Sequence, residues 1–116
     1  HDLGERDLSV QALTEALLLG RQMDERQEVM LLFEHIAYTL RESNPRVAAK
    51  LSGAAQALRT AVQSPKPERD LASYNQFLDS LRVRTSDADF QAAFDAGLNM
   101  DIDTAVDFAL ASIPLA

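Results

Sequence analysis

Apolar residues recur every three or four positions along most of the chain, and this spacing restricts the fold more than any other feature. A period of three to four places such residues on one face of an α-helix. No segment alternates apolar and polar residues for long enough to form a strand. The pattern therefore predicts an all-α protein with about six helices, in which neighbouring helices are antiparallel.

Polar and proline-containing breaks divide the pattern into these six segments. The breaks are Asp24-Glu25, Ser43-Asn44-Pro45 and Ser64-Pro65-Lys66-Pro67. The residue before a proline resists the α conformation, so helices end at such points. The expected helices cover residues 6–23, 26–41, 46–63 and 67–84, then a short helix from a Ser86 cap to Gly97, and a last helix capped by Asp101.

The second segment, 26–41, is apolar around more than half of its circumference. A helix of that kind needs neighbours on two sides, so we expect it to be the central, sandwiched helix. The third segment is rich in small residues around Gly53. Glycine inside a helix costs about 1 kcal/mol relative to alanine, so a closely crossing helix is expected there. The fourth segment has one apolar stripe, made of Leu71, Tyr74, Leu78 and Leu81.

The net charge of −7 is concentrated at the C-terminal end of the chain. Residues 85–116 carry six aspartates and no lysine or arginine. Nucleic-acid binding needs concentrated positive charge, as does attraction to an anionic membrane. We therefore expect no direct contact with nucleic acid and no membrane association. The last two helices are expected to dock on the third and fourth, with their aspartates outward.

Cysteine is absent, which excludes disulfides, thiol catalysis and cysteine-ligated zinc. The absence fits a reducing compartment. The apolar runs are too short to cross a membrane, and the first residues lack a signal-peptide pattern. A cytoplasmic chain is therefore expected.

One pattern of side-chain sizes occurs three times in the sequence. It consists of a medium-sized residue, a large residue one turn later, and then a small residue where a partner helix crosses, at offsets 0, 4, 7 and 8. The three copies are Ser9-Leu13-Ala16-Leu17, Val47-Leu51-Ala54-Ala55 and Ile102-Val106-Ala109-Leu110. The pattern resembles the second helix of a tetratricopeptide repeat (TPR).

The C-terminal half carries a longer resemblance, over residues 45–111 and more loosely over 6–42. Its elements are Ala48-Ala49-Lys50-Leu51-Ser52-Gly53-Ala54-Ala55, Phe90 to Gly97, and Ala105-Val106 with Ala109-Leu110. This order resembles the TPR-like C-terminal region of large bacterial LuxR-type regulators with a signal-transduction NTPase core. The resemblance implies a right-handed superhelical array of TPR-like helices. It also implies that residues 1–116 are a single domain from a larger multidomain regulator, in which nucleotide and DNA bind to other domains.

The sequence does not assemble a catalytic or metal-binding set. His35 has no second histidine one turn away, and zinc needs several converging ligands; we interpret it as a rim or partly buried helix residue. The pairs Asp87/Asp89 and Asp101/Asp103 precede helices, where aspartates cap the backbone and favour the helix dipole. We expect no enzyme activity, no metal and no cofactor.

Four residues are the candidate binding residues: Arg26, His35, Tyr38 and Arg59. The arginines are suited to receive a carboxylate from a partner peptide, and equally to pair with the acids of the chain. Tyr38, with Met30 and Phe33, fits either a ligand cavity or the core.

We expect a non-catalytic helical-repeat module for protein interaction or signal reception. Its partner would be another protein or another domain of the same chain. The alternative is a sensor that holds a small-molecule effector between the second, third and fourth helices.

Overall fold

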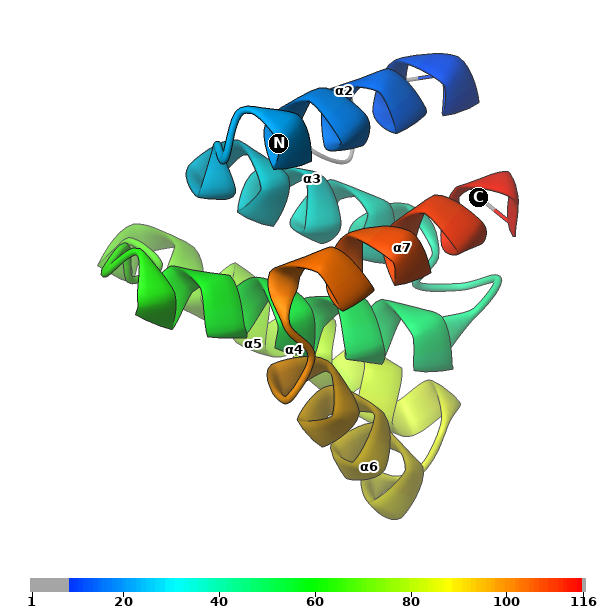
Figure 1. The fold of residues 1–116 in the computed structure, drawn as a ribbon. Helices are drawn as coiled ribbons and strands as arrows, with labels where there is room; N and C mark the ends of the chain where they lie inside the picture. The colour runs from blue at the N-terminus through cyan, green and yellow to red at the C-terminus, as the bar shows by residue number, and fades with distance from the viewer. Residues whose placement is uncertain (1–8, 116) are drawn as a thin grey trace.

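The computed structural model describes residues 9–115, and this part of the chain is all-helical, with no strand (Figure 1). The prediction of an all-α fold with six helices is confirmed for these residues. The first expected helix starts at residue 6, and residues 6–8 lie outside the described part. The helices are α2 (Val10–Gln22), α3 (Arg26–Thr39), α4 (Pro45–Ala61), α5 (Glu68–Arg84), α6 (Asp87–Leu98) and α7 (Ile102–Ser112), followed by the 3-10 helix η1 (Ile113–Leu115). Within residues 9–115 no helix has the length and apolar character to cross a membrane.

Side-chain caps start four of the helices. Ser9, Asn44, Ser86 and Asp101 each accept a hydrogen bond from the backbone N–H three residues further on. Such a cap satisfies one of the N–H groups that the first turn leaves without a helical partner. The predicted caps Ser86 and Asp101 are therefore confirmed. Gly97 lies at the C-terminal end of α6, as predicted, one residue before Leu98, and it does not have a positive φ.

Two helices end in a left-handed residue that is not glycine. Asp24 (φ 54°) follows α2, and Gln63 (φ 55°) follows α4. At the end of α4 the Gln63 N–H donates to the Thr60 carbonyl, and the Ser64 N–H donates to the Arg59 carbonyl at 2.9 Å. These two bonds form a Schellman motif. The motif turns the chain back across α4 at the start of the linker 62–67.

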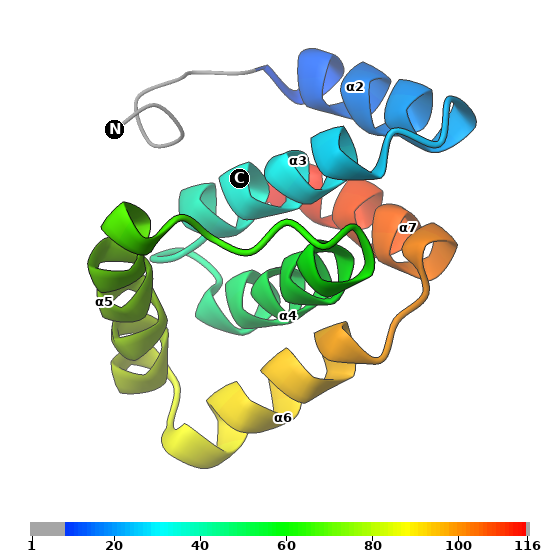
Figure 2. The same ribbon diagram turned by 90° about the vertical axis from the view of Figure 1, so that its left-hand side faces the viewer.

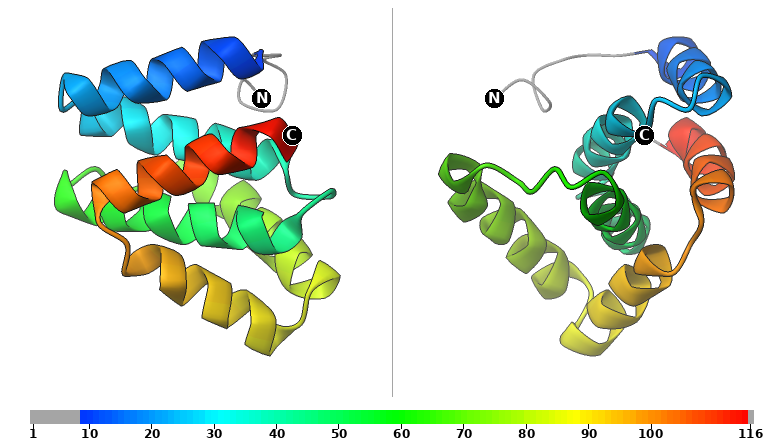
Figure 3. Two further views of the ribbon diagram at one scale, coloured as in Figure 1. Left: turned by 45° about the vertical axis from the view of Figure 1, so that its right-hand side comes forward. Right: turned by 60° about the vertical axis from the view of Figure 1, so that its left-hand side comes forward.

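The helices α2, α3, α4 and α6 pack as successive layers, as Figure 3 shows. The helix α3 lies between α2 and α4, as the width of its apolar face predicts. The position at the centre of the molecule belongs to α4, which contacts α3, α5, α6 and α7. We expected the segment 26–41 to be the central helix, and the structure instead places α4 (Pro45–Ala61) at the centre. The small residues of α4 explain the difference, because they let several neighbours approach its backbone.

The backbones of α4 and α6 touch where two glycines meet. A Cβ atom built on Gly53 would clash with the Phe94 carbonyl oxygen and lie 3.1 Å from the Leu98 nitrogen. One built on Gly97 would clash with the Lys50 carbonyl oxygen and lie 2.8 Å from the Ala54 nitrogen. Each glycine thus makes room for the other helix. The close crossing predicted at Gly53 is confirmed, and α6 is the helix that makes it.

The last helix, α7, packs against α2, the first helix of the described residues. It packs on α2, α3 and α4, and Asp107 accepts a hydrogen bond from Arg21 of α2 at 2.9 Å. The expected docking on the third and fourth helices therefore holds for α6, which contacts α4 and α5. It holds only in part for α7, which contacts α4 but also α2 and α3, and lies on the side of α4 away from α5 (Figure 2). All six aspartates of this region are exposed, as predicted.

The helix α5 packs less than the others. Leu81 is its one fully buried side chain, whereas Leu71 is 41% exposed and Tyr74 and Leu78 are half-buried. The predicted four-residue stripe is therefore confirmed at Leu78, which packs against the core, and at Leu81, and it is wrong at the exposed Leu71. The cause is the linker 62–67, which runs back across α4 and starts α5 away from the α4 surface (Figure 2). The helix packs against the core from Phe77 onward, where Phe77 and Leu78 are partly buried and Leu81 is fully buried.

The close approach of α4 and α6 at Gly53 predicts that alanine at this position destabilises the protein. Replacing an internal helix glycine by alanine normally stabilises a helix by about 1 kcal/mol. Gly53→Ala is expected to destabilise the protein by about 1–3 kcal/mol, because the added methyl group meets the Phe94 carbonyl. Urea unfolding followed by circular dichroism measures the change. As a reference, Ala72→Gly at an exposed site of α5 should cost about 1 kcal/mol. A higher urea midpoint for Gly53→Ala would contradict the crossing.

Candidate functional site

A groove of about 850 Å³ lies between α3 and α5, with α4 as its floor. We call it the α3–α5 groove. It exists because α5 leaves the α4 surface over most of its length. The residues that line it are Glu28, Leu31, Leu32, Glu34, His35, Tyr38, Arg41, Ser52, Arg59, Lys66, Asp70, Ser73, Tyr74, Gln76, Phe77 and Ser80.

Three of the four candidate binding residues line this groove. His35 and Tyr38 come from α3, and Arg59 comes from α4. His35 is 4% exposed, so it is a buried residue of the groove wall rather than a rim residue. Of the three residues considered for a cavity, Tyr38 faces the groove, whereas Met30 and Phe33 are fully buried in the core.

Arg26 lies elsewhere. Its Nε donates to the Asp24 carboxylate at 3.1 Å, next to the turn that joins α2 to α3. It lines a second hollow of about 290 Å³, where α4 meets Met100 and the first residues of α7. The structure therefore separates Arg26 from the other three candidates.

The floor of the α3–α5 groove is a buried ion pair between α3 and α4. Arg59 donates from Nε and Nη2 to the two oxygens of Glu34, at 2.9 and 3.0 Å. The two side chains are only 7% and 11% exposed. A bidentate pair of this geometry is among the stronger charge-assisted contacts in proteins. Arg59 is thus paired with an acid of its own chain, which was one of the two alternatives for the arginines.

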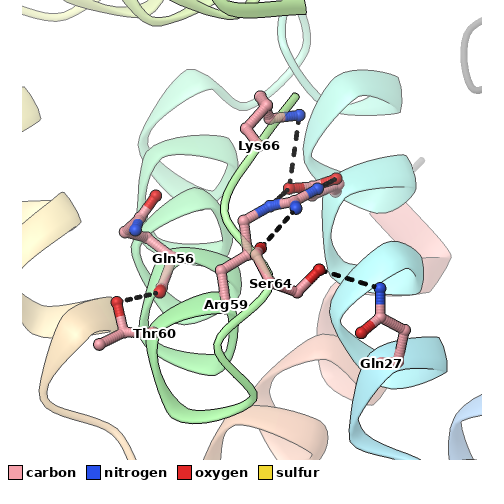
Figure 4. A network of polar contacts seen from close by, with 7 residues as sticks. Gln27, Gln56, Arg59, Thr60, Ser64 and Lys66 are labelled. Carbon is pink, nitrogen blue, oxygen red and sulfur yellow. Dashed lines mark hydrogen bonds and ion pairs between the residues drawn. The ribbon is translucent and has the colours of Figure 1, made fainter. Parts of the chain in front are cut away.

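The same pair anchors the linker that leads into α5. Arg59 Nη1 donates to the Ser64 carbonyl at 3.0 Å, and the Ser64 hydroxyl accepts from Gln27 of α3 at 3.3 Å (Figure 4). Lys66 follows, with its ammonium 3.6 Å from Glu34 Oε2 and a side chain only 17% exposed. Glu34, Arg59 and Lys66, from three segments, therefore meet in the groove, and we call this part its inner end.

Away from these charged side chains, aromatic rings line the groove. Tyr38 of α3 and Phe77 of α5 have ring centroids 5.9 Å apart, and they are the contact between the two walls. The Arg41 guanidinium lies 3.9 Å from the Tyr38 ring centroid and donates to the Tyr38 carbonyl. Leu31 is exposed on the same wall. The groove thus joins a charged inner end to an apolar, aromatic wall.

Tyr74 lies beside the charged inner end. The Lys66 ammonium is 4.7 Å from its ring centroid. Burial, with a smaller effect of the Glu34 charge, raises the pKa of Tyr74 to about 12, against an opposing effect of Arg59. The phenol therefore keeps its proton throughout the physiological pH range and can donate a hydrogen bond.

The acidic pairs of the C-terminal region act at helix starts. The backbone N–H of Thr104 donates to Asp101 at 2.7 Å, and this bond holds the pKa of Asp101 below its usual value. Asp89 accepts from Arg46 of α4, which ties α6 to α4 at 2.6 Å. Within residues 9–115 no group of three His, Cys, Asp or Glu side chains is placed to hold a metal ion.

Sequence reasoning missed four important groove residues: Glu34, Lys66, Tyr74 and Phe77. Glu34 pairs with a residue 25 positions away, and no local pattern announces such a contact. Lys66 could have been found more easily than Glu34. It stands between Pro65 and Pro67, and a residue before a proline favours an extended conformation. Tyr74 was predicted to lie on a buried apolar stripe, whereas in the structure it lines the wall of the groove.

Comparisons of the chain with family models, with curated proteins and with solved structures found no match. The geometry of the groove therefore carries the functional argument.

The buried ion pair predicts that losing Arg59 lowers the free energy of unfolding much more than losing an arginine from an exposed ion pair. Arg59→Met leaves the Glu34 carboxylate buried with only Lys66 nearby, and should lower the free energy of unfolding by about 3 kcal/mol. The matched control is Arg46→Met, whose ion pair with Asp89 is 66% and 48% exposed. An exposed pair contributes about 0–1 kcal/mol. Chemical denaturation of both variants is the measurement, and equal losses would contradict the structural role of Arg59.

Proposed function

We propose that this chain is a non-catalytic helical module that binds a segment of another protein, or of another domain, in the α3–α5 groove. The observation that supports this proposal most is the groove itself, about 850 Å³ in volume and walled by aromatic and aliphatic side chains. An exposed apolar groove between two helices is the usual acceptor of an amphipathic helix. Leu31, which lines the groove and is 37% exposed, adds to its apolar surface.

The charges of the groove also fit a binding role. Glu34 and Arg59, the most buried of them, neutralise each other in a bidentate pair. A carboxylate used in this way serves packing and not proton transfer. Glu28, Asp70 and Arg41 line the outer part of the groove. They suit a partner helix with an apolar face flanked by charges of both signs.

We further propose that the module is a TPR-like array from a larger bacterial regulator, whose other domains bind nucleotide and DNA. The layers of α2, α3 and α4, which pack in chain order, support this arrangement. In a solenoid each element contacts its neighbours. The contact of α7 with α2 is an addition to that scheme, and we assign α7 the role of a cover on one side of the array.

A second candidate function is the reception of a small-molecule effector in the same groove. Its location favours this candidate, since the groove lies between α3, α4 and α5. Its volume is within the range of about 300–1,000 Å³ that small-molecule sites have.

Peptide selection tests the first function directly. Amphipathic helical peptides selected on the wild-type chain should lose about tenfold in affinity with Leu31→Glu, because the new charge lies on the apolar wall. The matched control is Leu19→Glu, on α2 and 58% exposed. Fluorescence anisotropy gives the affinities. Selected peptides that bind all three proteins equally, or a selection that yields none, would contradict docking in the groove.

A further inference from the structure

The inner end of the α3–α5 groove holds more positive than negative charge. Arg59 and Lys66 share the single carboxylate of Glu34 (Figure 4). The three side chains are 7%, 17% and 11% exposed, so solvent screens the surplus charge poorly. Among the described residues, Glu28 and Asp70 also line the groove, but neither forms an ion pair with these cations. A buried surplus charge is costly unless an opposite charge pairs with it.

The two cations differ in what they can still bind. Arg59 has each of its three nitrogens on an acceptor, two on Glu34 and one on the Ser64 carbonyl. The Lys66 nitrogen is 3.6 Å from Glu34 Oε2, which is longer than a hydrogen bond. Its other neighbour is the ring of Tyr74, at 4.7 Å from the centroid. An ammonium carries three N–H donors, so Lys66 has donors to offer to a ligand.

The ring of Tyr74 lies beside Lys66, and both side chains line the groove. The Tyr74 phenol stays protonated because burial disfavours the phenolate. A hydroxyl and an ammonium that line the same end of a groove are two donors that suit the two oxygens of a carboxylate.

The other side chains of the groove indicate that the ligand has an apolar body. Leu31, Leu32, Tyr38 and Phe77 line it, and the aromatic contact between Tyr38 and Phe77 lies one helical turn along α3 from Glu34. An acid that places its carboxylate at Lys66 can thus place an apolar body against these side chains. The single surplus charge matches a monoanion better than a doubly charged phosphate.

We propose that the inner end of the α3–α5 groove binds a small carboxylic acid with an apolar body, and that Lys66 and Tyr74 hold its carboxylate. The inference rests on the effector-binding form of the proposed function and names the chemical class of that effector. Lys66 is the residue that discriminates the acid from its neutral analogues, and Arg59 and Glu34 hold the site in shape.

Titrations followed by ¹H–¹⁵N correlation spectra test the site with defined probes. Octanoate and phenylacetate are the acids, and octanamide and phenylacetamide are their neutral counterparts, all at one ionic strength. The acids should shift the amide signals of residues 66–77 and 34–38 saturably, and the amides should bind at least about tenfold more weakly, because they lose a charge-assisted bond.

Two lysine variants provide the control, because Lys50 and Lys66 are the two lysines of the chain. Lys66→Gln should weaken the acids about tenfold. Lys50→Gln, which removes the same charge beside Phe108 and away from the groove, should leave their affinity unchanged. Tyr74→Phe should weaken the acids as well.

Three results would overturn the proposal: no saturable shift with either acid, equal binding of acids and amides, or equal loss in both lysine variants. The peptide selection is independent of these probes. Peptides that bind the groove while the acids fail would leave the docking function standing and remove the acid site alone.

Discussion

The close crossing of α4 and α6 determines where every later part of the chain can go. Gly53 and Gly97 bring the two backbones into contact, so α6 occupies one face of α4. The helix α3 covers a second face, and α7 packs between α3 and α4 on the side away from α5. The helix α5 precedes α6 in the chain but has no comparable face left on α4. It reaches the core through the buried Leu81 and the partly buried Phe77 and Leu78, and its first turns are largely exposed.

The linker 62–67 then gives the groove its shape. The Schellman motif at Gln63 reverses the chain, and Arg59 binds the Ser64 carbonyl while it pairs with Glu34. These contacts hold the start of α5 near α3, as Leu81 holds its end near α6. A helix held at its start by the linker, and in its C-terminal half by Phe77, Leu78 and Leu81, leaves a space beside α4. The groove is therefore a consequence of the way in which the chain connects α4 to α6, and its polar inner end is the linker anchor itself.

Local patterns predicted the parts of this fold that depend on local chemistry. Helical spacing predicted the six helices, Ser86 and Asp101 were predicted as caps, and the small residues around Gly53 predicted a close crossing. The features that were missed depend on contacts between distant residues. The apolar spacing of α5 predicted a buried face, but the fold gives only the C-terminal half of that face a partner in the core. For the same reason His35, Tyr38 and Arg59 were found as candidates without the partners Glu34 and Lys66 that make a site of them.

Hydrogen exchange of the native protein tests most directly the claim that α5 is held at its ends while α4 and α6 form the stable centre. The account predicts that amides of α4 and α6 exchange only through global unfolding, with the full free energy of unfolding. Amides of residues 71–78 should exchange through local opening at a clearly lower free energy, since sparse packing lowers local stability. Protection of residues 71–78 equal to that of α4 would contradict the account, because it would require a packed face on α5.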